Sequence, residues 1–127
     1  MPLALTNIDL GLNISLDDII YNRTPEQKTV SFSHLSRLAH SSHNSINRRY
    51  RKFMRFKRSD DTNINKARAK RCCGMVKKHI HDLKWIRAYL HKHNMVEDHP
   101  VFISKINTWI DECERIHSRY KHHIKEL

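Results

Sequence analysis

The sequence predicts an all-α protein, in which an antiparallel helical hairpin is joined by a third, basic helix in a small bundle and preceded by a flexible N-terminal tail. Glycine and proline are scarce, with two and three residues among 127, and no sustained apolar–polar alternation indicates a strand. Apolar residues instead recur at alternating spacings of three and four, which is typical of one helix face. We expect one domain with a tail, divided into residues 1–30 and 31–127.

The tail differs from the rest of the chain in charge. Residues 1–22 contain three Asp and no Lys or Arg, so all 24 basic residues follow them. Within the tail, residues 15–23 have the features of a short helix: Ser15 is a suitable N-cap, and Asp18 is its acidic partner three residues later. The apolar side chains on one face are Leu16, Ile19 and Ile20. Such a helix is too short to be stable alone, so we expect it to fold in the groove of a partner.

The segment Leu10–Arg23 resembles the helicase-binding motif at the N-termini of mRNA export adaptors of the Aly/REF family. The residues that match its S-L-D-D-I-I core and the basic position that follows are Ser15, Leu16, Asp17, Asp18, Ile19, Ile20 and Arg23. Ile14 stands where methionine is common, and Tyr21 where a basic residue is common. The resemblance implies that the tail binds the DEAD-box helicase of the TREX mRNA export complex. It does not extend to the remaining chain, which lacks the RNA-recognition motif of Aly.

The middle segment, residues 31–58, has apolar residues spaced as in a helix. Residues 40–47, however, are rich in Ser, Asn and His, which favour helices weakly, so the continuity of this helix stays open. A break is expected at 59–63. Three aromatic residues interleave with the basic residues at the end of the segment: Tyr50, Phe53 and Phe56. We expect Tyr50 and Phe53 to pack into the core.

Two basic runs, one ending the middle segment and one starting the hairpin, predict a nucleic-acid-binding surface. Arginine and lysine contact phosphates, and exposed aromatic rings stack on unpaired bases. The candidate residues are Arg48, Arg49, Arg51, Lys52, Arg55, Lys57, Arg58, Lys66, Arg68, Lys70 and Arg71. Other interpretations are a solvated basic face, a nuclear localisation signal, or a surface for calmodulin or an anionic membrane.

Residues 65–127 give the clearest pattern, that of a long helical hairpin. The seam positions of its first helix are Cys72, Val76, His79, Leu83, Ile86 and Leu90. Those of its second helix are Phe102, Ile106, Trp109, Cys113, Ile116 and Tyr120, with Ile103, Ile110 and Ile124 widening the stripe. Between them, Asn94 suits a C-cap, Asp98 an N-cap and Pro100 a first turn.

The register of this hairpin brings polar groups together. If Leu90 faces Phe102, then His79 lies near Cys113. The same register places Cys72 near Tyr120.

Catalytic and metal-binding patterns are absent from the sequence. There is no glycine-rich phosphate loop, nucleophile elbow or acid pair in the folded part, so we expect no enzyme. The eleven histidines lack the spacing of a zinc module, and Cys72 and Cys73 are adjacent rather than separated by two residues. His79, Cys113 and His117 could converge across the seam, but we expect ordinary seam and surface histidines, with no metal and no cofactor.

Together these patterns predict a non-enzymatic nuclear adaptor that docks the helicase through its tail and binds RNA, or DNA, through its basic body. No apolar run approaches the roughly 20 residues of a membrane span, and the odd cysteine count favours a reducing compartment. The alternative is a helical-hairpin interaction module, viral or chromatin-associated, that binds an acidic protein or DNA and packs the N-terminal helix on its own core. Monomer and homodimer both stay open.

Overall fold

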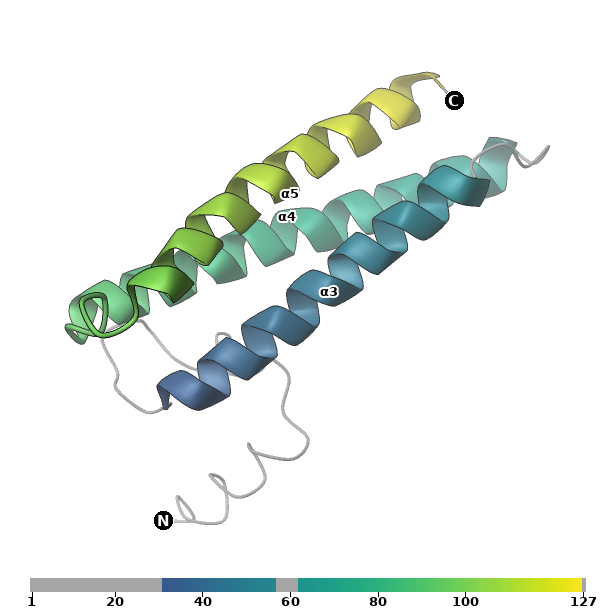
Figure 1. Cartoon of the computed structure of the whole chain (residues 1–127). Coiled ribbons are helices and arrows are strands. Elements are labelled where there is room, and N and C mark those ends of the chain that lie inside the picture. Colours follow the sequence, from purple (N-terminus) through teal and green to yellow (C-terminus); the bar gives the residue numbers. More distant parts are fainter. Residues whose placement is uncertain (1–30, 57–61, 127) are drawn as a thin grey trace, which may run out of the picture.

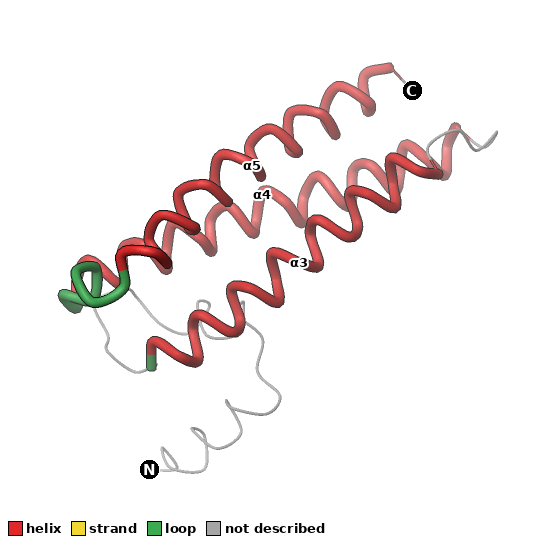
Figure 2. The backbone as a smooth tube through the Cα atoms, in the orientation of Figure 1, coloured by secondary structure: helices red, strands yellow, loops and turns green. Residues whose placement is uncertain are grey.

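The computed structural model describes residues 31–56 and 62–126, and in this part of the chain it contains three helices and no strand (Figure 2). The helices are α3 (Phe32–Phe56), α4 (Thr62–Lys92) and α5 (Pro100–Glu126). The predicted all-α class, with a hairpin and a third helix, is confirmed. None of the described helices combines the length and apolar character needed to cross a membrane.

The three helices form an up-down-up bundle (Figure 1). Helices α4 and α5 are antiparallel, and α3 runs alongside them in the direction of α5. Contacts along α3 establish this direction, because Phe32 stacks on His99, His43 contacts Glu112 and Tyr50 contacts Arg119 further along both helices.

Helix α3 is continuous through the segment that its sequence left undecided. Ser31 caps it: the Ser31 hydroxyl accepts a hydrogen bond from the His34 amide at 3.2 Å, and its carbonyl accepts one from Leu35 at 3.1 Å. The side chains that α3 buries are Leu35, Ala39, His43, Ile46 and Phe53. Packing of this face against the hairpin outweighs the weak helix propensity of residues 40–47.

The turn between α4 and α5 is built on Asn94, which has φ 55°. Asparagine tolerates this left-handed conformation after a helix C-terminus. The Met95 amide donates to the Leu90 carbonyl at 2.9 Å, and the Asn94 amide donates to the His91 carbonyl at 3.3 Å. Both bonds satisfy carbonyls that the end of α4 would otherwise leave unpaired, in agreement with the predicted C-cap.

The predicted N-cap of α5 is wrong by one residue. The Ile103 amide donates to the His99 carbonyl at 3.2 Å, so His99, and not Asp98, holds the capping position. Pro100 is then the first helical residue, where its fixed φ is suitable and its missing N–H is not needed.

The hairpin seam follows the predicted register. Cys72 lies beside Tyr120, and His79 lies close to Cys113. Trp109 departs from the prediction, because it is only partly buried and packs on His43 of α3. Ile110 takes the buried place next to it. The core is therefore one cluster with contributions from all three helices.

Candidate functional site

The bundle gathers positive charge in one half. Its topology brings together residues 48–56 of α3, 62–78 of α4 and 113–126 of α5, which we call the basic half. The basic residues there are Arg48, Arg49, Arg51, Lys52, Arg55, Lys66, Arg68, Lys70, Arg71, Lys77, Lys78, Arg115, Arg119, Lys121 and Lys125. Its acidic residues are only Glu114 and Glu126, whereas acidic and basic residues are equal in number in the rest of the described chain.

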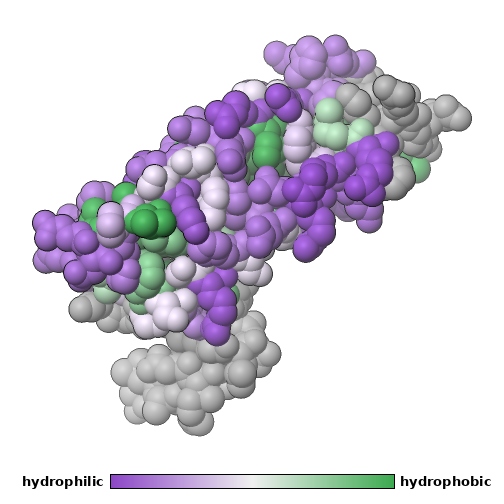
Figure 3. All heavy atoms as spheres, in the orientation of Figure 1, coloured by the Kyte–Doolittle hydropathy of each residue, from purple (hydrophilic) through white to green (hydrophobic). Residues whose placement is uncertain are grey.

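The basic residues predicted to bind nucleic acid lie mostly on the surface. On α3 the exposed ones are Arg48, Arg49, Arg51, Lys52 and Arg55. On α4, Lys70 and Arg71 are exposed, whereas Lys66 and Arg68 are partly buried. Strongly hydrophilic side chains gather over the C-terminal half of α3 in Figure 3. Lys57 and Arg58 lie outside the described residues.

A groove of about 340 Å³ lies between α3 and α5 at the border of this half, and Asn47 and Glu112, just outside the half, also line it. Three of its lining residues are arginines, namely Arg51, Arg115 and Arg119, and we call it the arginine groove. The Arg119 guanidinium donates a hydrogen bond to the Tyr50 hydroxyl at 3.1 Å. This bond holds the two side chains together on one side of the groove. Guanidinium groups converging in a groove suit phosphate oxygens, which they bind in a bidentate manner.

The contribution of α5 to this surface is not evident from the sequence. Arg115 and Arg119 stand on an amphipathic helix, where isolated basic residues indicate only a solvated face. Their place beside Arg51 depends on the parallel register of α3 and α5, which the sequence did not specify.

Two of the three aromatic residues of the basic run, Tyr50 and Phe53, pack against the core. Phe53 is buried and contacts the rings of Tyr120 and His123. Tyr50 is partly buried and meets the edge of Tyr120. This confirms the expected core packing of both residues. The Phe56 side chain lies outside the described residues.

A second polar group of residues lies inside the bundle, where the three helices meet. It consists of His43 from α3, His79 from α4 and Cys113 from α5, and we call it the histidine–cysteine cluster. His43 Nδ1 lies 3.2 Å from His79 Nε2 and 3.8 Å from Cys113 Sγ. All three residues are buried, with exposed fractions of 3%, 4% and 0%.

Two residues of α5 fix the orientation of His43. Glu112 Oε2 lies 3.2 Å from His43 Nε2, and Trp109 stacks on the imidazole with a centroid distance of 4.6 Å. Because a carboxylate only accepts hydrogen bonds, Nε2 carries the hydrogen and donates it to Glu112. The neutral ring therefore presents the lone pair of Nδ1 to His79 and Cys113.

Burial has the largest effect on the pKa values of His43 and Cys113. It lowers the pKa of His43, although the hydrogen bond and the charge of Glu112 oppose that change. Burial also raises the pKa of Cys113 to about 12, with a further contribution from the charge of Glu112. At neutral pH the His43 imidazole and the Cys113 thiol are thus uncharged.

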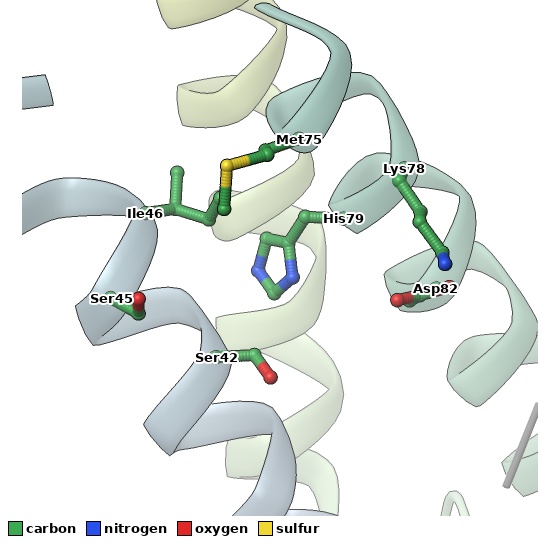
Figure 4. Close-up of a pocket in the computed structure, with 7 residues that line it drawn as sticks. All are labelled: Ser42, Ser45, Ile46, Met75, Lys78, His79 and Asp82. Carbon is green, nitrogen blue, oxygen red and sulfur yellow. The ribbon is translucent and has the colours of Figure 1, made fainter. Parts of the chain in front are cut away.

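A surface pocket of about 170 Å³ lies next to the cluster, between α3 and α4. Figure 4 shows the His79 ring between the two helices. The other lining residues are Ser42, Ser45 and Ile46 of α3 and Met75, Lys78 and Asp82 of α4. His79 therefore belongs to both the buried cluster and the wall of a pocket.

The cluster differs from the group of His79, Cys113 and His117 that the sequence suggests. The residue that joins His79 and Cys113 is His43, and His117 has no place in the group. A signal for His43 was present, because it completes the buried spacing of Leu35, Ala39 and Ile46 along α3. Within a Ser- and Asn-rich segment, however, a histidine indicates a weak point of the helix rather than a buried position.

The proposed helicase-docking residues Ser15, Leu16, Asp17, Asp18, Ile19, Ile20 and Arg23 all lie outside the described residues. Comparison of the chain with protein-family models, with curated proteins and with solved structures found no match.

Proposed function

We propose that this protein is a non-enzymatic nuclear adaptor that links RNA to the DEAD-box helicase of the TREX mRNA export complex. In this proposal the basic half holds the RNA, and residues 15–23 dock the helicase. The observation that carries the RNA-binding part is the arginine groove, where Arg51, Arg115 and Arg119 line one depression. The docking part rests on the resemblance of residues 10–23 to the Aly/REF motif.

The chemistry of the basic half favours contact with the phosphate backbone. Its exposed groups are guanidinium and ammonium groups, which neutralise phosphates whatever the base sequence. Phe53 is buried in the core, and Tyr50 packs on Tyr120 while its hydroxyl accepts a bond from Arg119, so phosphate contacts outweigh base stacking on this surface. We therefore expect binding to single-stranded RNA that depends strongly on salt and weakly on sequence.

The RNA-binding part is tested by the salt dependence of affinity for a single-stranded RNA. The affinity should fall linearly with the logarithm of salt concentration, with a slope of about −0.7 for each phosphate contact. Replacing Arg51 and Arg115 by Ala should reduce the slope by roughly 1–2. The matched control is Lys84→Ala with Lys92→Ala, which removes the same charge from exposed positions outside the basic half.

The control pair should leave the slope unchanged. No measurable RNA binding at low salt would contradict the RNA-binding part and would favour the alternative, in which the basic half binds an acidic protein. A duplex DNA of the same length distinguishes a preference for RNA from general polyanion binding.

The docking part is tested separately, with the purified helicase and the full chain. Leu16→Ala combined with Ile19→Ala should abolish helicase binding, because these side chains would fill the apolar groove. The cooperative thermal unfolding of the body should stay as in the wild type. Loss of that cooperativity would instead place the N-terminal helix in the protein's own core.

A further inference from the structure

We propose that His43, His79 and Cys113 form a binding site for a zinc-like transition-metal ion at the centre of the bundle. The site goes beyond the proposed adaptor function and would exist whether or not the protein binds RNA. Each residue comes from a different helix, so a bound ion would fasten α3, α4 and α5 to one another.

The distances fit tetrahedral coordination. With Zn–N bonds of about 2.05 Å and Zn–S bonds of about 2.3 Å, neighbouring ligand atoms lie about 3.3 Å apart for N and N, and about 3.5 Å apart for N and S. The observed separations from His43 Nδ1 are 3.2 Å to His79 Nε2 and 3.8 Å to Cys113 Sγ. All three ligand atoms lie within 4.8 Å of one another. Small side-chain adjustments therefore suffice to enclose an ion.

The surroundings of His43 provide an independent indication. Metal-binding histidines almost always donate their second ring N–H to a carboxylate, a carbonyl or water, which fixes the tautomer and directs the other nitrogen at the metal. Glu112 accepts such a bond from His43 Nε2 at 3.2 Å, and Trp109 stacks on the ring. The nitrogen directed at His79 and Cys113 is thus the one that a metal requires.

The ligand set indicates the class of ion. Two imidazoles and one thiolate suit zinc and related borderline-soft ions, whereas magnesium and calcium require oxygen ligands. On binding, the Cys113 thiol would release its proton to the solvent, and His79 would carry its ring hydrogen on Nδ1. Three protein ligands leave a fourth position for water or a small ligand. The pocket that His79 lines would give such a ligand a route from the surface.

The test is a cobalt titration of the full chain in the presence of a reductant that does not bind metals. Cobalt replaces zinc in such sites and reports a thiolate ligand by a charge-transfer band in the near ultraviolet. We expect this band, together with intense visible bands of tetrahedral cobalt, to saturate at one equivalent and to vanish on addition of zinc.

Variants assign the thiolate and test the role of Glu112 in orienting His43. Cys72→Ser combined with Cys73→Ser leaves Cys113 as the single cysteine and should keep the band, as should His117→Gln. Cys113→Ser should remove it, and Glu112→Gln should weaken metal affinity about 10–100-fold through the orientation of His43. Circular dichroism establishes that each variant is folded.

Several outcomes would overturn the proposal. These are the absence of a charge-transfer band in the wild type, the loss of the band in the variant that retains Cys113 alone, and its persistence in Cys113→Ser. The wild-type result and the single-cysteine variant decide the matter even if Cys113→Ser fails to fold. Metal bound only to surface histidines would give no thiolate band.

Discussion

His43 illustrates how one polar residue on a helix face can connect three helices. It contacts Glu112 and Cys113 on α5 and His79 on α4. A buried imidazole without partners would destabilise the fold. Here Nε2 donates to Glu112, and Nδ1 faces His79 and Cys113. This buried position therefore tolerates a histidine where leucine or isoleucine would be usual.

The protonation of His43 predicts how stability depends on pH. Because burial lowers the pKa of His43 in the folded state, the unfolded chain, with its usual pKa of about 6.5, binds more protons below that pH. The free energy of unfolding should therefore rise with pH up to about 6.5 and level off above it. The change is measured by urea unfolding with EDTA present, which removes any contribution from metals.

His43→Gln should flatten this pH dependence, whereas His81→Gln, at an exposed position, should not. The charged and titratable neighbours of His43 are His40, His79, Glu112 and Cys113. His117, whose pKa burial also lowers, should account for part of the slope that remains. An unchanged slope in His43→Gln would contradict the assignment.

Gly74 is a second residue with a predictable effect. It lies on the exposed side of α4, and a Cβ atom added there would meet nothing within 4 Å. Gly74→Ala should therefore stabilise the protein by about 0.5–1 kcal/mol, because glycine loses more backbone entropy in a helix. Ala67→Gly, also at an exposed position of α4, is the control and should destabilise it by a similar amount. Thermal or urea unfolding measures both, and a destabilised Gly74→Ala would show that the position is not open.

At the scale of helices, the sequence predicted the hairpin better than the third helix. The alternating spacing of three and four in α4 and α5 is uninterrupted, so their seam and register could be predicted from Leu90 and Phe102. Helix α3 was uncertain because its Ser and Asn residues favour helices weakly, and only packing on the hairpin decides its length. The same dependence on packing explains why the sequence alone does not place His43, Arg115 and Arg119 in sites.

The seam of the hairpin predicts where truncation destabilises the fold. Ile106 is fully buried, so Ile106→Ala should cost about 2–5 kcal/mol, from lost burial and the cavity left behind. Val101, at 68% exposure, lies five residues earlier on the same helix, and Val101→Ala should change stability by less than about 0.5 kcal/mol. Urea unfolding compares the two variants. Equal effects would contradict the assigned seam.

At the scale of the whole molecule, the up-down-up order determines the distribution of charge. Basic segments that are far apart in the sequence meet in one half because α4 returns along α3 and α5 returns along α4 (Figure 1). The remaining half has balanced charge. This asymmetry leaves one end of the bundle as the natural contact for a polyanion.

In the proposed adaptor, a single chain holds RNA and helicase at the same time through separate segments. The most direct measurement is the amount of labelled single-stranded RNA retained on immobilised helicase when the full chain is added, with helicase alone as the baseline. Retention should rise above the baseline with the wild type and with Lys84→Ala/Lys92→Ala. It should return to the baseline with Leu16→Ala/Ile19→Ala and with Arg51→Ala/Arg115→Ala. Retention at the wild-type level with either of these two variants would contradict the proposal.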